Sequence, residues 1–233
     1  MTKDEKSKSV RWIGSSRSDL RKFPPEVRTD IGYALWLVQL GDRPPQAKPL
    51  KGIVSGSGVL EIVESHDGDA YRVVYTVRFA KALYVLHAFQ KKSTRAKKTA
   101  QHDIDLIRSR LKMAQDHYQE NMTVSASAKI EEGSGNVFAD LGLPDAEELL
   151  SKAQLMGRIA EIIKGRRLTQ DQAAEVLETT QPIVSNLMNG QLHGFSLERL
   201  VRFLNALGRD VDIVVKRRPR SRGRARTRVR VAG

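Results

Sequence analysis

The sequence predicts two domains of different class: an α+β domain, with an antiparallel sheet and helices, followed by an all-α domain that ends in one short strand. Three observations support this prediction. Three apolar segments follow one another closely between residues 59 and 89, as in a meander of hairpins. Residues 145–207 repeat apolar side chains at helical spacing. Small and polar residues separate the two parts at 122–136, where we place a linker.

The composition limits the classes of protein to consider. The chain has 233 residues and no cysteine, so disulfides and thiolate metal sites are excluded. We expect neither a metal nor another cofactor. No run of 18 apolar residues occurs, and the N-terminus has no apolar signal-peptide core. We therefore expect a soluble, cytoplasmic protein without a membrane segment.

The net charge of +13 is divided unevenly along the chain. Residues 1–121 carry 22 Lys/Arg against 14 Asp/Glu, residues 122–215 carry 9 against 13, and residues 216–233 carry 9 against none. Basic surfaces of this strength most often bind nucleic acid, although they can also serve solubility alone. We expect the Arg-rich tail, residues 217–233, to be disordered without a partner. It either adds phosphate affinity or only solubilises the chain.

The first domain, which we place at residues 1–121, begins with the short alternating segment VRWI. Pro24-Pro25 then opens a helix that Gly41 ends. Its apolar side chains recur at helical spacing: Val27, Ile31, Ala34, Leu35 and Val38. The glycine-rich connector KPLKGIVSGSG leads from this helix to the strands.

Three strand candidates follow that connector: VLEIVE, AYRVVYTVRF and ALYVLHAFQ. SHDG is a hairpin signal between the first two, and a short turn at Ala80-Lys81 joins the last two. Such close spacing favours antiparallel neighbours. Thr99 can cap a final helix, 100–118, whose apolar face consists of Ile104, Ile107, Leu111 and Ala114.

The second domain, which we place at residues 137–216, is predicted to be helical. A helix starts at Asp145-Ala-Glu-Glu148, and its apolar stripe consists of Leu149, Ala153, Met156, Ala160 and Ile163. Thr169-Gln-Asp-Gln172 repeats the capping pattern, and Ser196 caps a last helix that Gly208 ends. DVDIVV then alternates as the one short strand.

The most specific pattern in this domain is TQDQAAEVLETTQPIVSNLMNG, which is typical of a helix-turn-helix. Ala173-Ala174 supplies the small residues where two helices cross, and Glu178-Thr179 forms the turn. Four apolar residues pin the second helix: Val176, Leu177, Val184 and Leu187. The second helix opens with Thr180, Gln181 and Pro182 and exposes Ser185 and Asn186. Such side chains suit the major groove, whereas the alternative is a plain pair of packed helices.

This pattern resembles the helix-turn-helix antitoxins of the HigA type, within the Xre/Cro-like repressors, over about residues 128–216. The resemblance implies DNA contacts from Gln170, Gln181, Pro182, Ser185 and Asn186. It also implies palindromic operators and a homodimer. One departure is Glu178, because the wider group often has glycine at that turn position.

A cationic site is predicted at the end of the last strand in the first domain, where FQKKSTRAKK holds five basic side chains and no acid. Arg72 and Lys91-Lys92 leave neighbouring strands, so they can converge on one rim, and Lys51 precedes them in a loop. Such a cluster is unfavourable unless an anion such as phosphate sits there. The alternative is a solvated strand end that guards the sheet edge.

PLKG, VLEIVE, YRVVYTV and YVLHAFQKKS together resemble the HigB branch of the RelE-type toxins, over about residues 9–118. This family implies a ribosome-dependent endoribonuclease that cuts messenger RNA without a metal, by attack of the ribose 2′-hydroxyl on the adjacent phosphate. Arg72, Lys91 or Lys92, and Lys51 match its basic residues.

Two features depart from the RelE pattern. Glu61 and Val63 replace strand lysines, and Lys98 replaces a tyrosine. Glu61 is a candidate general base, or else simply the salt-bridge partner of Arg72. His87 lies within an apolar strand, where we expect a packed core residue rather than a catalyst.

These resemblances predict a toxin and its antitoxin in one chain, with Met122 as a former antitoxin start. The predicted partners are ribosomal messenger RNA, operator DNA and a second copy of the chain. The acidic segment 131–148 is expected to pack on the first domain and reduce its access to RNA. The alternatives are a non-enzymatic transcriptional regulator with an inactive toxin-like module, and a phage-type repressor with an RNA-binding appendage.

Overall fold

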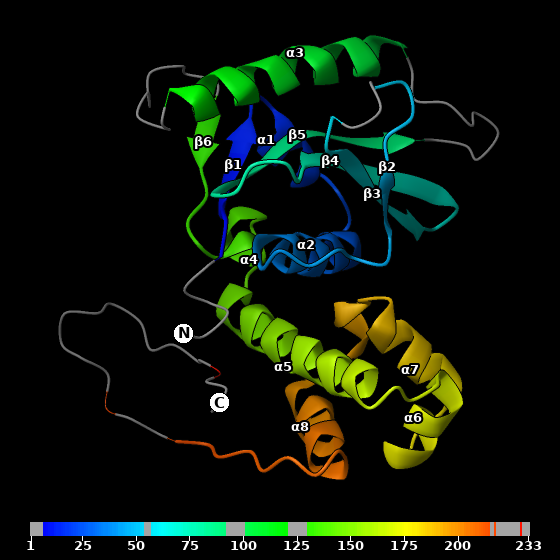
Figure 1. The fold of residues 1–233 in the computed structure, drawn as a ribbon. Coiled ribbons are helices and arrows are strands. Elements are labelled where there is room, and N and C mark those ends of the chain that lie inside the picture. The colour runs from blue at the N-terminus through cyan, green and yellow to red at the C-terminus, as the bar shows by residue number, and fades with distance from the viewer. Residues whose placement is uncertain are drawn as a thin grey trace. The chain divides into compact units, whose positions relative to one another are not determined.

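The computed structural model describes residues 7–53, 57–91, 101–120 and 130–214, together with residues 217 and 229. The chain forms two compact units, Met1–Pro144 and Asp145–Gly233 (Figure 1). This division differs from the predicted boundaries at 121 and 137, because residues 130–144 pack on the first unit. Met122 lies outside the described residues, as does the predicted tail except at 217 and 229.

A six-stranded sheet forms the centre of the first unit, in the order β2-β3-β4-β5-β1-β6. Its strands are β1 (Ser9–Ile13), β2 (Ala47–Pro49), β3 (Val59–His66), β4 (Asp69–Thr76), β5 (Ala82–Lys91) and β6 (Ile130–Glu132). The predicted meander is confirmed, since β3, β4 and β5 are antiparallel neighbours. The sheet as a whole is mixed rather than antiparallel, because β1 runs parallel to β5. The long connection between these two strands lets the chain return in the same direction.

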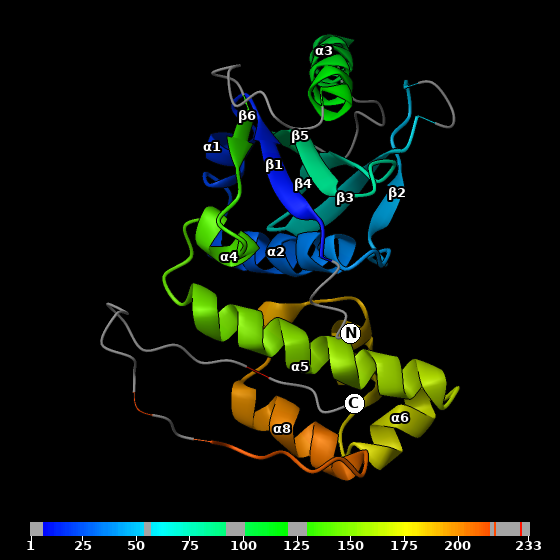
Figure 2. The same cartoon turned by 60° about the vertical axis from the view of Figure 1, so that its left-hand side comes forward.

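Helices α2 and α3 lie on opposite faces of this sheet (Figures 1 and 2). The helices of the first unit are α1 (Ser16–Leu20), α2 (Pro25–Gln39), α3 (Gln101–Gln119) and α4 (Val137–Asp140). The helix predicted after Pro24-Pro25 is α2, and all five residues of its predicted apolar face are buried. The helix predicted at 100–118 is α3, and its four predicted core residues are also buried.

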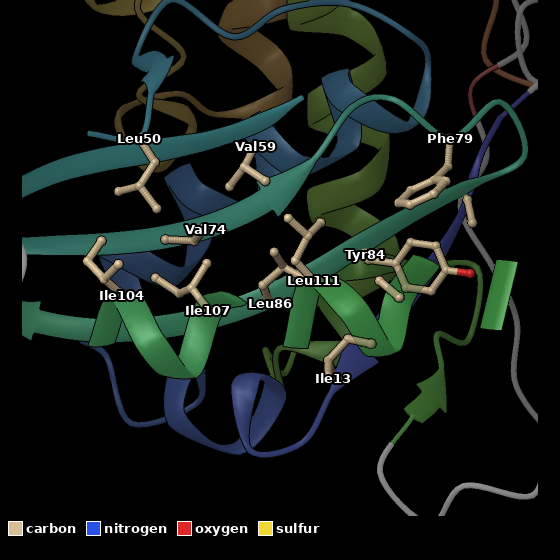
Figure 3. Packing of buried hydrophobic residues seen from close by; sticks show 12 residues of the cluster. Ile13, Leu50, Val59, Val74, Phe79, Tyr84, Leu86, Ile104, Ile107 and Leu111 are labelled. Carbon is tan, nitrogen blue, oxygen red and sulfur yellow. The ribbon is translucent and has the colours of Figure 1, made fainter. Parts of the chain in front are cut away.

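One hydrophobic cluster joins α3 to the sheet (Figure 3). Ile104, Ile107 and Leu111 of α3 meet Val74 and Leu86 from the neighbouring strands β4 and β5. Full burial of an aliphatic side chain stabilises by about 1.5–3 kcal/mol relative to exposure. These contacts therefore hold α3 over the strands that carry the predicted site.

Residues 130–144, called here the docking segment, belong to the first unit. Residues 130–132 form β6, which pairs antiparallel with β1, so this part of the predicted linker is a strand. Asn136 caps α4 by accepting a hydrogen bond from the amide of Phe138 at 3.1 Å. Phe138 and Leu141 are fully buried. The polar composition of GSGN suggested a linker, but the apolar residues that follow it dock on the sheet unit.

The second unit is helical in its described part, with α5 (Ala146–Gly165), α6 (Gln170–Val176), α7 (Gln181–Met188), the 3₁₀ helix η2 (Leu192–Gly194) and α8 (Leu197–Ala206). Its core is apolar and includes Met156, Ile159, Val184, Leu187, Leu200 and Phe203. The predicted stripe of α5 is confirmed in part. Ala153, Met156 and Ile163 are buried, whereas Leu149 and Ala160 are partly exposed.

The predicted C-terminal strand is not present in residues 211–214 of the structure. Ile213 and Val214 are 82% and 69% exposed. The alternating pattern of DVDIVV is compatible with a strand, but a strand also needs a neighbouring strand to accept its backbone hydrogen bonds. No helix among the described residues is long and apolar enough to cross a membrane.

Candidate nucleic-acid interfaces

Four adjacent strands place charged residues on one face of the first unit's sheet. Lys48 of β2 pairs with Glu61 of β3, and Val63, two residues further along β3, pairs with Arg72 of β4. Lys91 on β5 pairs with Ala70, two residues before Arg72. Because directly paired residues and every second residue share a face, the four charged residues of this set, called here the strand face, point the same way.

Arg72 and Glu61 form an ion pair at the centre of the strand face. Nη1 of Arg72 donates to the Glu61 carboxylate, and the two side chains are only 14% and 5% exposed. The buried Nε of Arg72 has no hydrogen-bond acceptor among the described residues. The salt bridge that we weighed against a general-base role for Glu61 is therefore present. The base role itself stays a prediction.

Lys91 lies within the field of this pair. The pKa of Lys91 is lowered, first because burial removes some of the water around its ammonium group, and then because Arg72 and Lys48 place positive charge nearby. Glu61 acts in the opposite direction. The structure thus brings Arg72, Lys91 and Glu61 to one face, as expected from the sequence. It adds Lys48, which the sequence pattern did not single out and which is found only through its pairing with Glu61.

The structure does not place the other two predicted basic residues, Lys51 and Lys92, on the strand face. Lys51 is exposed in the turn that follows β2. Lys92 lies outside the described residues, as does the remainder of the basic run up to Lys98. The roles of Lys51 and Lys92 therefore stay predictions.

A polar cluster fixes α3 beside the strand face. Nη1 of Arg110 lies 3.3 Å from Nδ1 of His87, and Nε2 of His87 lies 3.2 Å from the Asp103 carboxylate. Since a guanidinium only donates, Nδ1 accepts and Nε2 carries the proton, which gives a neutral imidazole. Burial lowers the pKa of His87, and the Arg110 cation lowers it further, against the raising effect of Asp103. His87 is buried as expected, but Asp103 and Arg110 were not foreseen.

Acidic groups of the docking segment contact basic groups of the first unit. Glu132 forms an ion pair with Arg11 at 2.5 Å, and Glu131 forms one with Arg17 at 3.1 Å. Asp140 is 1% exposed and accepts a hydrogen bond from the indole of Trp12. The acidic segment expected to pack on the first domain therefore does so up to residue 144. The acids at 145–148 belong to the second unit.

Helix α4 also contacts α2 through an unusually close apolar approach (Figure 2). A Cβ added to Gly32 of α2 would lie 2.8 Å from Cδ1 of Phe138. Only a residue without a side chain allows this ring to lie so close to the helix. The glycine inside an apolar helix is visible in the sequence and indicates a close contact. The sequence does not show that Phe138 makes that contact.

In the second unit, α6 and α7 form the predicted helix-turn-helix. Thr169 caps α6, with its hydroxyl accepting from the Gln172 amide at 3.2 Å and its own amide donating to the Gln172 side chain at 3.0 Å. Four of the predicted packing residues are fully buried or nearly so: Ala173, Leu177, Val184 and Leu187. Val176 is 37% exposed, so the prediction that it pins the second helix is wrong. It lies on the solvent side of α6.

The turn between these helices is strained at one residue. Glu178 has φ of 49°, in the left-handed region that favours glycine. This is the turn position at which the wider group of Xre/Cro-like repressors often has glycine and this chain has glutamate. Next to it, Thr179 accepts a hydrogen bond from Arg199 of α8 at 3.4 Å. The guanidinium of Arg199 lies 5.7 and 5.5 Å from the ring centres of Phe195 and Phe203, so α8 supports the turn.

The N-terminal end of α7 presents the predicted reading residues. Thr180, Gln181 and Pro182 are exposed, and Ser185 and Asn186 are partly exposed. The side-chain amide of Gln181 donates a hydrogen bond to Gln170 of α6. This bond fixes the orientation of Gln181 and leaves its oxygen available as an acceptor. The six predicted contacts therefore gather around one end of α7, but the bound state remains a prediction.

Comparisons with known proteins find a family match for each part of the chain. Residues 18–112 match the family described as Phage derived protein Gp49-like, and residues 137–216 match a family described as Helix-turn-helix domain. A solved structure described as an XRE family transcriptional regulator is 48% identical, over 38% of this chain and 100% of that chain, with a TM-score of 0.36. No curated protein matches.

Proposed function

Because the chain joins a Gp49-like domain of the RelE/HigB toxin type to a helix-turn-helix domain, we propose that it is a toxin–antitoxin protein in a single polypeptide. The first unit is a ribosome-dependent messenger-RNA endonuclease, and the second binds operator DNA and represses its own operon. The observation that carries this proposal is the position of residues 137–144. They belong to the helix-turn-helix match, yet they pack on the Gp49-like unit.

The strand face supports cleavage of RNA. Attack of a ribose 2′-hydroxyl on the adjacent phosphate places extra negative charge on the phosphoryl oxygens in the transition state. Arg72, Lys48 and Lys91 stabilise this charge without a metal. Glu61 holds the guanidinium of Arg72 in place and is the nearest candidate for the general base.

The exposed end of α7 supports binding to DNA. Gln181, oriented by Gln170, is suited to an adenine in the major groove, where glutamine bonds N6 and N7 together. Ser185 and Asn186 follow on the same helix, and the free amides at its N-terminus suit a phosphate. A homodimer of the chain places two such helices on the two halves of a palindromic operator.

A second function is favoured by one observation, the same ion pair. The carboxylate of Glu61 neutralises the charge of Arg72 at the centre of the strand face. In that case the first unit is an inactive, toxin-like binding module of a transcriptional regulator. Glu61→Gln separates the two proposals, because it removes both the neutralising charge and the candidate general base. Loss of cleavage supports the nuclease with Glu61 as its base, whereas a first unit that cleaves no RNA with either residue supports the inactive module.

Expression of residues 1–121 in growing cells tests the leading proposal. We expect growth arrest with cleaved transcripts, which Arg72→Ala abolishes and which co-expression of residues 122–233 reverses. Soluble protein that leaves growth and transcripts unchanged would support the inactive module instead. Cleavage that persists with Arg72→Ala would show that the strand face is not the nuclease site.

A further inference from the structure

Three arginines of the first unit gather around the end of α4 in the docking segment and are called here the arginine cluster: Arg17, Arg21 and Arg28. They come from α1, the residue that follows α1, and α2, in that order, and none belongs to the strand face. We propose that the arginine cluster is a second RNA-binding surface, which holds backbone phosphates, and that the docking segment masks it. This inference rests on the proposed function, since it assigns RNA as the partner of the first unit.

The docking segment presents oxygen atoms to the arginines much as a phosphate chain does. The carbonyl oxygen of Asp140 accepts from Nε of Arg17 at 3.0 Å and from Nε of Arg21 at 2.8 Å. The next carbonyl, of Leu141, accepts from Nη1 of Arg28 at 3.0 Å. These carbonyls end α4 and have no partner within the helix. Each of these guanidinium groups gives a single bond to a neutral carbonyl, whereas a phosphate offers charged oxygens that a planar guanidinium binds more strongly and in pairs.

The charges of the two surfaces nearly cancel. The docking segment carries neither lysine nor arginine, and its Glu131 and Asp140 carboxylates both pair with Arg17, so two carboxylates face the three guanidinium groups. Release of the segment leaves all three positive charges without these partners. The buried Nε of Arg28 already has no hydrogen-bond acceptor among the described residues. The cluster thus has more donor capacity than the segment uses.

RNA is the partner that these observations favour. Two of the oxygens now bound, those of Asp140 and Leu141, come from consecutive backbone positions, a spacing that resembles a regular polyanion more than scattered carboxylates. A polymer held on the strand face extends beyond the scissile phosphate, and phosphate contacts fix its register without reading sequence. The remaining possibility, an acidic protein segment, becomes an outcome of the test below.

Gly32→Ala in the full chain opens the cluster without altering either charged surface. The new methyl group collides with the Phe138 ring, while alanine favours the helical backbone of α2. Gly165→Ala is the matched control, because nothing lies within 4 Å of a Cβ at that helical position. Amide exchange at Ile130–Glu132 reports whether the docking segment is released. Phe138→Ala with Asp140→Asn opens it from the other side, should Gly32→Ala be accommodated.

The probe is a short, fluorescein-labelled 2′-O-methyl oligouridylate, which lacks the attacking hydroxyl and cannot be cleaved. We expect Gly32→Ala to bind it about tenfold more tightly than the parent chain and Gly165→Ala to bind it equally. Adding Arg21→Gln and Arg28→Gln to Gly32→Ala should reverse the gain. It should also reduce the slope of log affinity against log salt by roughly 1.4, or roughly 0.7 for each phosphate that the protein no longer binds.

Three outcomes would overturn the inference. The first is a released docking segment with no gain in RNA affinity. The second is an equal loss when Lys81→Gln and Lys112→Gln, exposed lysines of the first unit, replace the two arginine substitutions. The third is displacement of the probe by polyglutamate of matched charge as readily as by unlabelled oligouridylate, which would identify an acidic protein as the partner. An opened chain that binds the probe but cleaves no transcript refutes only the nuclease.

Discussion

The indole Nε1 of Trp12 donates a hydrogen bond to a carboxylate oxygen of Asp140 at 3.2 Å. Trp12 lies on β1 of the first unit's sheet, and Asp140 ends α4 within the stretch that matches the helix-turn-helix family. Both side chains are buried, and the same carboxylate accepts from the Ser134 amide at 2.9 Å. The first residues of the helix-turn-helix match, up to residue 144, are therefore anchored within the first unit.

Asp140→Ala should weaken this anchor. The substitution leaves the buried indole N–H and the Ser134 amide without their acceptor, which costs about 1–3 kcal/mol for a buried group. Amide exchange of β6 and α4, together with urea unfolding of the first unit, measures the effect. Asp116→Ala, at an exposed position of α3, is the control and should change the unfolding free energy by less than about 0.5 kcal/mol. Equal effects of the two substitutions would show that Asp140 is not an anchor.

The stability of the first unit should fall as the pH decreases below 6.5. Burial lowers the pKa of both His87 and His117 in the folded chain from 6.5, so both stay neutral where the unfolded chain takes up protons. Because the unfolded state then binds more protons, acid favours unfolding. Urea midpoints at pH 7.5 and pH 5.5 measure this loss.

His87→Gln should make that loss smaller, since the glutamine amide can still accept from Arg110 and donate to Asp103 but does not titrate. His102→Gln is the control, because His102 is exposed on α3. An unchanged pH dependence in His87→Gln, with His102→Gln showing the reduction, would exclude His87 as a source of the effect.

Glu178→Gly should stabilise the helix-turn-helix. Glycine removes the cost of a left-handed backbone, about 1–2 kcal/mol. This gain is larger than the cost of the extra conformational entropy that a glycine chain loses on folding. We expect a net gain of about 1 kcal/mol in the free energy of opening, measured by amide exchange at Val184. Glu175→Gly, inside α6, should instead destabilise by about 1 kcal/mol. A loss of stability in both variants would mean that the turn at Glu178 is not strained.

Gln181→Ala should reduce operator binding and relax the base preference at one position, since a bidentate contact contributes about 1–3 kcal/mol of discrimination. Gln170→Ala should also reduce operator binding, because it removes the partner that orients Gln181 and the DNA contact predicted for Gln170 itself. Selection of binding sites from random duplexes measures both. Gln191→Ala, beyond the end of α7, is the control. A uniform loss on every sequence, with the base preference kept, would assign Gln181 to the DNA backbone instead.

The sequence predicted those parts of the fold whose pattern is local. The periods of α2 and α3, the hairpins of β3 to β5 and the caps at Thr169 and Ser196 are set by neighbouring residues, and the structure contains them. The hairpin of β3 and β4 was also clear enough from the sequence to place Glu61 near Arg72. The helix-turn-helix was predictable because its packing and reading residues lie within one short stretch.

Long-range pairings were not predictable from the sequence. Nothing in VRWI shows that β1 lies parallel to β5, or that its other edge accepts β6 from more than a hundred residues away. The contact of Phe138 with Gly32 and the field of Lys48 on Lys91 likewise depend on the assembled sheet. DVDIVV failed as a strand for the same reason, since alternation does not supply a neighbour.

The most direct test of the central claim measures transcript cleavage in cells that produce the full chain with Gly32→Ala. With the docking segment displaced, we predict growth arrest and cut messenger RNA, and we predict neither when Arg72→Ala is added. Gly165→Ala should leave growth as in the parent chain. If the Gly32→Ala chain is soluble and its docking segment is released, yet transcripts stay intact, the first unit is not a restrained nuclease and the account is wrong.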